Sequence, residues 1–195
     1  ALLSILSGLI ALATGPAFSY LFVYGERVLG VSAGLLALLV VLAGPAGLVG
    51  ILLGRAAADR LGRNLAAGVS MAGTGVAVAY AYGGSAPRLA VGYLLAIAAS
   101  SAFAPPTGAL GAELVPTRVR ATLAGWITFA GVLGAVIGIA GFGVLADATG
   151  GFDRASRAIG IVTAVTALGF LLLPETRGVE LEDLEGDEDS AGGAG

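Results

Sequence analysis

The sequence predicts an all-α membrane protein that folds as a bundle of six transmembrane helices. Hydrophobic residues make up 57% of its 195 residues and charged residues only 12%, and its mean hydropathy is +0.95. Soluble domains carry roughly 25% charged residues, so the chain lacks an ordinary water-facing surface. Six windows of 17 to 27 residues contain no charged residue: 1–25, 28–54, 64–87, 89–112, 121–146 and 158–174. About 20 apolar residues in a helix cross a bilayer core, so each window predicts one span.

The helices follow these windows in order, because a spanning strand would be shorter and would alternate in polarity. Within one membrane domain over residues 1–174, we expect helices at about 1–25, 31–53, 65–83, 89–112, 122–146 and 157–173. The chain opens directly inside the first apolar window and does not begin with Met. We therefore expect the sequence to be a piece of a longer protein.

Proline and glycine shape the predicted helices. Pro16, Pro45, Pro105 and Pro106 lie well inside apolar windows. An interior proline bends a helix and frees a carbonyl that a neighbour or a cavity must satisfy. Glycine accounts for 33 residues, and pairs four residues apart include Gly50 with Gly54 and Gly134 with Gly138. This spacing puts both glycines on one helix face and lets a neighbouring helix approach closely.

The charged residues fall into a basic membrane body and an acidic tail. Residues 175–195 hold eight of the thirteen acidic residues and one of the ten arginines, so we expect a solvated, disordered cytoplasmic tail. The connections after the even-numbered helices, together with the tail, hold six arginines, and the other side holds four. This bias predicts a multi-pass protein of the cell membrane with both termini in the cytoplasm.

Several kinds of chemistry are excluded by what the chain lacks. It contains no Cys and no His, so a disulfide scaffold, a thiolate metal site and histidine base catalysis are ruled out. No Asp, Glu, Arg or Lys lies deep within a window. Proton relays within membranes are usually formed by such ionisable residues. We therefore predict that the protein is not an enzyme and uses no metal, no cofactor and no nucleic acid.

The connection between the second and third helices carries a recognisable motif. It reads Gly54-Arg55-Ala-Ala-Ala-Asp59-Arg60-Leu61-Gly62-Arg63. Gly62 permits a sharp reversal of the chain, and the arginines hold the connection at the membrane surface. The pattern resembles the loop signature of the major facilitator superfamily, which lies between the second and third helices of each six-helix half.

Two further motifs follow later even-numbered helices. The segment after the fourth helix, from Glu113 to Arg120, resembles a motif of sugar porters and related metabolite symporters. The segment beginning Pro174-Glu175-Thr176-Arg177 is similar to the end of sugar porters. The resemblance implies the carboxyl-terminal half of a twelve-helix carrier, with the amino-terminal six-helix half as its partner.

The resemblance also implies a cytoplasmic latch made of ion pairs that lock when the carrier faces outward. Carried over to this sequence, the latch comprises Gly54, Asp59, Arg60, Gly62, Arg63, Glu113, Arg118 and Arg120, with Glu175 as an extra partner. The alternative interpretation is that these charges only follow the positive-inside tendency.

The solute site is expected between the two halves, lined by the first, second, fourth and fifth helices, with the third and sixth facing lipid. The expected solute contacts are Tyr20, Ser101, Phe103 and Trp126. The sequence departs from the sugar-porter pattern, since the first helix lacks a Gln pair and the fourth lacks a Trp.

The leading functional hypothesis is secondary active transport of a small organic solute by alternating access. The solute is a sugar, an organic acid or a similar metabolite, and a symporter is expected. Three alternatives stay open: a multidrug or metabolite efflux carrier of the same superfamily, a non-transporting six-helix membrane scaffold, and a half-size carrier that dimerises.

Overall fold

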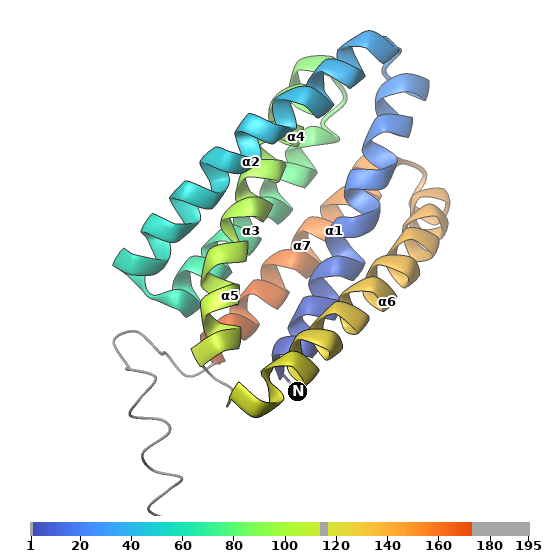
Figure 1. Ribbon diagram of the computed structural model, residues 1–195. Helices are drawn as coiled ribbons and strands as arrows, with labels where there is room; N and C mark the ends of the chain where they lie inside the picture. The colour runs from blue at the N-terminus through green and yellow to red at the C-terminus, as the bar shows by residue number, and fades with distance from the viewer. Residues whose placement is uncertain (1, 114–116, 173–195) are drawn as a thin grey trace, which may run out of the picture.

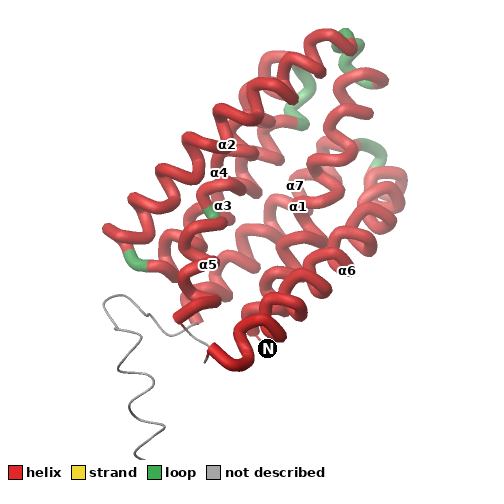
Figure 2. Tube along the Cα trace, in the orientation of Figure 1, coloured by secondary structure: helices red, strands yellow, loops and turns green. Residues whose placement is uncertain are grey.

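The computed structural model describes residues 2–113 and 117–172 of the chain. The helices of this part are α1 (Leu2–Arg27), α2 (Ala33–Leu61), α3 (Arg63–Ala81), α4 (Ala86–Ala102), α5 (Ala104–Glu113), α6 (Thr117–Thr149) and α7 (Phe152–Leu168). A 3₁₀ turn, η1 (Gly169–Leu172), continues α7. The described residues contain no β-strand, as Figure 1 and Figure 2 show.

Five segments in the described ranges are long and apolar enough to cross a membrane. They are Ser4–Arg27, Ala33–Leu61, Arg63–Ala81, Ala86–Leu110 and Ala121–Thr149. The fourth of these segments joins α4 to α5 across a break at Phe103. α7 has 17 residues, and η1 lengthens it. The prediction of an all-α membrane fold is confirmed, while the expected acidic tail over 175–195 lies outside the described residues.

Two helices extend beyond their expected ends. α2 continues to Leu61, because the run of alanines after Arg55 contains no helix breaker before Gly62. α6 begins at Thr117, so Arg118 already lies in its first turn. Arginine and alanine are good helix formers. The charge that ends an apolar window therefore does not end the helix.

The spans run alternately up and down, with α4 and α5 forming one descending span. The lower end of the bundle, at the bottom of Figure 1, holds the start of α1, the turn between α2 and α3, the end of α5 and the start of α6. The upper end holds the turns that follow α1, α3 and α6. α2 lies along one side of the bundle and α6 along the other. α2 packs against α4, α6 packs against α1, and α3 contacts both α4 and α7.

Two clusters of buried apolar side chains fill the bundle. The upper cluster joins α1, α2, α3, α4, α6 and α7, and its largest members are aromatic. The lower cluster is smaller and includes Leu6 of α1, Met71 of α3, Leu110 of α5 and Phe170 of η1. The two ends of the bundle therefore have different cores.

Glycine allows the closest helix contacts in the described structure. In α2 and in α6, two glycines four residues apart face backbone carbonyl oxygens of a neighbouring helix. The pairs are Gly50 with Ala98, Gly54 with Ala102, Gly134 with Gly8, and Gly138 with Leu12. A methyl group at any of these four glycines would overlap the facing carbonyl. Only glycine permits such backbone approach, as in other membrane helix pairs.

The two outer helices are the least buried. Only 17% of the α2 span and 22% of the α6 span are buried, whereas 56% of the α3 span is. The exposed residues of α3 form one apolar stripe of Leu65, Val69, Val76 and Tyr80. α7 has a similar stripe that includes Ile161, Val165 and Leu168. A single apolar stripe suits contact with lipid, whereas α2 and α6 leave most of their circumference open.

Candidate functional site

The turn between α2 and α3 consists of a single residue, Gly62. Its φ of 94° and ψ of 159° lie in a region that is essentially restricted to glycine. Its N–H donates to the carbonyl of Ala58 at 3.2 Å, and its carbonyl accepts from Ala66 N–H at 3.1 Å. One residue thus ends one helix and begins the next, which places both helix ends at the lower end of the bundle.

The charged residues of this first motif lie at the surface around that turn. Arg55, Asp59 and Arg60 are exposed on the last two turns of α2, and Arg63, the first residue of α3, is half-buried. Gly54 lies away from the turn, because it is buried against the Ala102 carbonyl in the seam with α4. The motif therefore combines a helix contact, a cluster of surface charges and a one-residue reversal.

The second motif lies at the same end of the bundle. Glu113 is the last residue of α5, and Arg118 and Arg120 lie near the start of α6. Figure 1 shows these helix ends at the lower end, together with the α2/α3 turn. The side chains of these three residues, and the whole of Glu175, lie outside the described residues. The fold thus brings the two motifs to one end, and the latch itself stays a prediction.

Tyr20, the first expected solute contact, is a half-buried residue between α1 and α6. Its hydroxyl donates to the Ile139 carbonyl at 3.3 Å, and its ring centroid lies 5.1 Å from that of Phe142. It also lines a cavity of about 520 Å³ near the upper end, together with Asp147 and Phe152. This cavity combines an exposed carboxylate, a phenol and the backbone of a glycine-rich turn.

Ser101 and Phe103 lie at the break between α4 and α5. Ser101 is half-buried, and its hydroxyl oxygen faces Gly47 of α2. The ring of Phe103 packs edge-on against Phe170, with centroids 5.3 Å apart, next to the lower core. The two prolines that follow explain the break, since neither can donate the backbone hydrogen bond that would continue α4.

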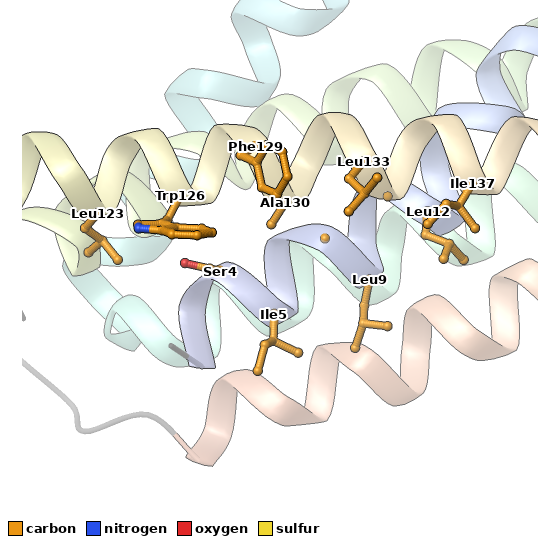
Figure 3. Close-up of a pocket in the computed structure, with 12 residues that line it drawn as sticks. Ser4, Ile5, Leu9, Leu12, Leu123, Trp126, Phe129, Ala130, Leu133 and Ile137 are labelled. Atoms are coloured by element: carbon orange, nitrogen blue, oxygen red, sulfur yellow. The ribbon is translucent and has the colours of Figure 1, made fainter.

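Trp126 lies on α6 at one end of an apolar groove of about 640 Å³ between α6 and α1. Its side chain is 61% exposed and packs edge-on against Phe129. Figure 3 shows Ser4 beside Trp126 at this end and Ile137 toward the other end. Tyr20 and Trp126 therefore line different cavities, and Ser101 and Phe103 lie at a third place. The structure does not bring the four expected solute contacts together.

An aromatic cluster at the upper end was not expected from the sequence. Phe142 and Phe152, from α6 and α7, surround Tyr24 of α1 and Tyr82 at the end of α3. The Tyr24 and Tyr82 rings lie 4.9 Å apart, and the Tyr82 and Phe152 rings stack at 6.4 Å. The available signal was that Tyr24, Tyr82 and Phe142 lie near the ends of their predicted spans on one side of the membrane, and that Phe152 lies in a connection on the same side.

Hydrogen bonds to the backbone tie this cluster to α1 and to the connection between α3 and α4. The hydroxyl of Tyr82 donates to the Ala17 carbonyl at 2.6 Å. The hydroxyl of Tyr24 donates to the Tyr82 carbonyl at 3.2 Å and accepts from Gly84 N–H at 3.0 Å. Burial, reinforced by Tyr24, raises the pKa of the Tyr82 hydroxyl above its ordinary value. Tyr82 therefore stays protonated and keeps its role as a donor.

The chain belongs to the Major Facilitator Superfamily. The model of this family matches residues 1–191, almost the whole sequence. Family membership, together with five helices long and apolar enough to cross a membrane, makes the chain part of a multi-pass membrane protein. The resemblance inferred from the loop motifs is confirmed at the level of the superfamily.

Two curated plant proteins are similar to parts of the chain. One is "Probable inorganic phosphate transporter 1-6" of Arabidopsis thaliana, with 38% identity over 79 residues. The other is "Low affinity inorganic phosphate transporter 8" of Medicago truncatula, with 39% identity over 83 residues. The alignments cover 39% and 40% of this chain but only 14% of the length of each relative. Both printed names concern phosphate, and neither relative is described as a sugar porter.

Proposed function

We propose that this chain is one six-helix half of a secondary carrier that moves a small solute across the cell membrane by alternating access. The family match over residues 1–191 is the observation that carries this proposal. A second six-helix half completes the carrier and forms the other wall of the solute site. The lower end of the bundle faces the cytoplasm, as the predicted excess of arginines on that side favours.

The open faces of α2 and α6 support a partner of this kind. Both faces carry helical glycines with nothing within 4 Å of an added side-chain carbon: Gly34 and Gly44 on α2, and Gly125, Gly131 and Gly141 on α6. Small residues on a membrane helix favour close packing against another helix, and lipid contact does not require them. α2 and α6 lie on opposite sides of the bundle, so a partner that contacts both would span the face between them.

The charged lower end is the proposed latch. Asp59 and Arg60 are exposed, and the second motif begins at Glu113 on a neighbouring helix end. One exposed ion pair contributes less than about 1 kcal/mol, so no single pair holds a conformation. A network that forms in one state and breaks in the other biases the equilibrium between them. In the proposed transport cycle, the latch supplies this difference in free energy between the two states.

The solute is held by neutral groups of this half. The charge-free windows leave hydroxyls, aromatic rings and backbone carbonyls at helix breaks as the available contacts. Ser101 and Phe103 are the better supported of the four expected contacts, because a broken helix exposes backbone dipoles near a carrier site. Tyr20 is already engaged with the Ile139 carbonyl, and Trp126 lines an apolar groove.

Inorganic phosphate is a second candidate solute beside an organic metabolite. The names of the two similar plant proteins favour it. A phosphate anion needs strong donors or cations, and the charge-free windows of this half carry neither Lys nor Arg. In a phosphate carrier, the cationic contacts would therefore come from the other half.

Uptake into liposomes tests the proposal. The chain is reconstituted alone and together with an amino-terminal six-helix half, and uptake of labelled phosphate is compared with uptake of labelled sugars and organic acids. We expect no uptake by the chain alone and saturable uptake of one solute class by the complete carrier. Saturable uptake by the chain alone as a monomer would contradict the proposed half. Uptake of sugar but not of phosphate would remove the second candidate.

A further inference from the structure

Two seams in the bundle are built in the same way. Pro16 lies in α1, and Pro106 lies in α5, which continues α4; both side chains are fully buried. α1 packs against α6, and α4 packs against α2. Each seam therefore has a span with a buried proline on one side and a pair of glycines four residues apart on the other.

Each proline removes the usual partner of one carbonyl. In an α-helix, the carbonyl of residue i−4 accepts from the N–H of residue i, and proline has no N–H. Pro16 thus leaves the Leu12 carbonyl without its helical donor, and Pro106 does the same to the Ala102 carbonyl. A carbonyl in an apolar interior is costly when it lacks a partner, because lipid and apolar side chains cannot donate.

The second glycine of each pair faces the same carbonyl that the proline frees. Gly138 lies against the Leu12 oxygen, and Gly54 lies against the Ala102 oxygen. In both cases an added methyl group would overlap that oxygen, so the glycine Cα–H group points toward it. Contacts between a Cα–H group and a carbonyl oxygen recur at close helix interfaces and are weakly attractive.

We propose that Gly138 and Gly54 are the donors that satisfy these two proline-freed carbonyls, so that each helix bend is held by the neighbouring helix. The bend and the seam then form a single joint. α1 changes its bend only as α6 shifts along it, and α4 with α5 does so only as α2 shifts. The proposal concerns the helix packing of this chain and does not depend on the solute or on the partner half.

The first glycine of each pair provides a matched control. Gly134 faces the Gly8 carbonyl, and Gly50 faces the Ala98 carbonyl, with the same close approach. Those two carbonyls keep their ordinary helical donors, the N–H groups of Leu12 and Ala102. If the glycines only provide space, the stability cost of replacing either glycine of a pair should not depend on the proline. In the proposed role, only the cost of replacing the second glycine, Gly138 or Gly54, depends on it.

A double-mutant cycle tests the α1/α6 joint. P16A restores an N–H group that can bond the Leu12 carbonyl within α1, so G138A should then cost less than it does in the wild-type chain. Unfolding of the chain in mixed micelles is followed by the fluorescence of its single tryptophan, Trp126. A Cα–H contact corresponds to a coupling of about two- to fivefold in the unfolding equilibrium constant.

The control cycle replaces Gly134 in the same backgrounds, and its penalty should be the same with and without P16A. Equal coupling of P16A to both glycines, or to neither, would overturn the proposal. Where G138A does not fold, NMR of glycine-labelled protein supplies a second readout. P16A should move the Hα resonance of Gly138 and leave that of Gly134 in place. An unchanged Gly138 resonance would also overturn the proposal.

Discussion

The upper and lower ends of this bundle are held together by different means. At the upper end, four aromatic rings from α1, α3, α6 and α7 interlock, and Tyr24 and Tyr82 donate hydrogen bonds to the backbone of other segments. At the lower end, a smaller apolar cluster lies near helix ends whose charged residues, such as Asp59 and Arg60, face outward. Interlocked aromatic rings therefore distinguish the upper end, while both ends carry exposed charges, including the Asp153–Arg157 ion pair of the upper end.

The difference indicates which end can change at low energetic cost. Buried aromatic contacts and backbone hydrogen bonds must be broken before the upper end can separate. Contacts between exposed charges contribute little individually and are weakened by salt, so any such contacts among the exposed charges of the lower end can form and break at low energetic cost. In the carrier half that we propose, the upper end would stay fixed while the lower end adjusts.

Replacing Tyr82 should have the largest effect on this comparison. Tyr82→Ala removes a fully buried ring and its hydrogen bond to Ala17, so we expect a loss of about 3–5 kcal/mol in the free energy of unfolding. Tyr80→Ala is the control, because Tyr80 is 47% exposed and its replacement should change stability by less than about 0.5 kcal/mol. Equal effects in denaturant titrations would show that the upper cluster is not a special source of stability.

Replacing Gly62 tests the backbone of the lower end. Gly62→Ala should cost about 1–3 kcal/mol, because alanine does not tolerate the φ and ψ of this turn. Gly34→Ala, in an open part of α2, should be neutral or stabilising. The unfolding free energies of both variants provide the test, and a neutral Gly62→Ala would mean that α2 and α3 can turn in another way.

High pH should weaken the upper end selectively. The folded-state pKa of Tyr82 is raised above its unfolded value of 10.0, so its contribution is fully present below pH 10. Above this pH, the unfolded tyrosine loses its proton while the folded one keeps it, and stability falls by about 1.4 kcal/mol per pH unit. Denaturant titrations between pH 8 and pH 11 should show this fall, measured against the pH profile of Tyr82→Phe. Identical profiles would contradict the buried, protonated hydroxyl.

Charge reversal at the latch should have the smallest effect on stability. Asp59→Arg changes an exposed residue, so we expect less than about 0.5 kcal/mol in unfolding free energy. In the complete carrier it should nevertheless reduce transport strongly while leaving membrane insertion intact. Radiolabelled uptake, normalised to the inserted protein, measures this effect. Wild-type uptake rates in the Asp59→Arg carrier would show that Asp59 is a surface charge with no part in a latch.

The sequence was sufficient for the all-α membrane fold, because long charge-free windows reflect the requirement for a spanning helix. It was less informative about helix ends. Asp59 and Arg60 lie beyond the apolar window that ends at residue 54, yet α2 runs through both. Helix formation depends on backbone hydrogen bonding and residue propensity, whereas hydropathy marks only the apolar part of a helix.

Contacts between distant segments were beyond sequence reasoning. Gly138 and Pro16 each carried a local signal, but nothing in either window indicates that Gly138 faces the carbonyl freed by Pro16. The aromatic cluster raises the same difficulty, since Tyr82 meets Phe142 and Phe152 only after four helices have packed. The four expected solute contacts lie in three separate places for the same reason.

α2 and α6 are the faces that we propose meet a second six-helix half. Since this chain contains no cysteine, single cysteines can be introduced at Gly44 and Gly131 on those faces, and at Val76 and Val165 on the apolar stripes of α3 and α7. In the complete carrier, membrane-soluble maleimides should label the α3 and α7 positions and spare the α2 and α6 positions. In the chain alone, all four should react. Equal labelling of all four positions in the complete carrier would contradict the account.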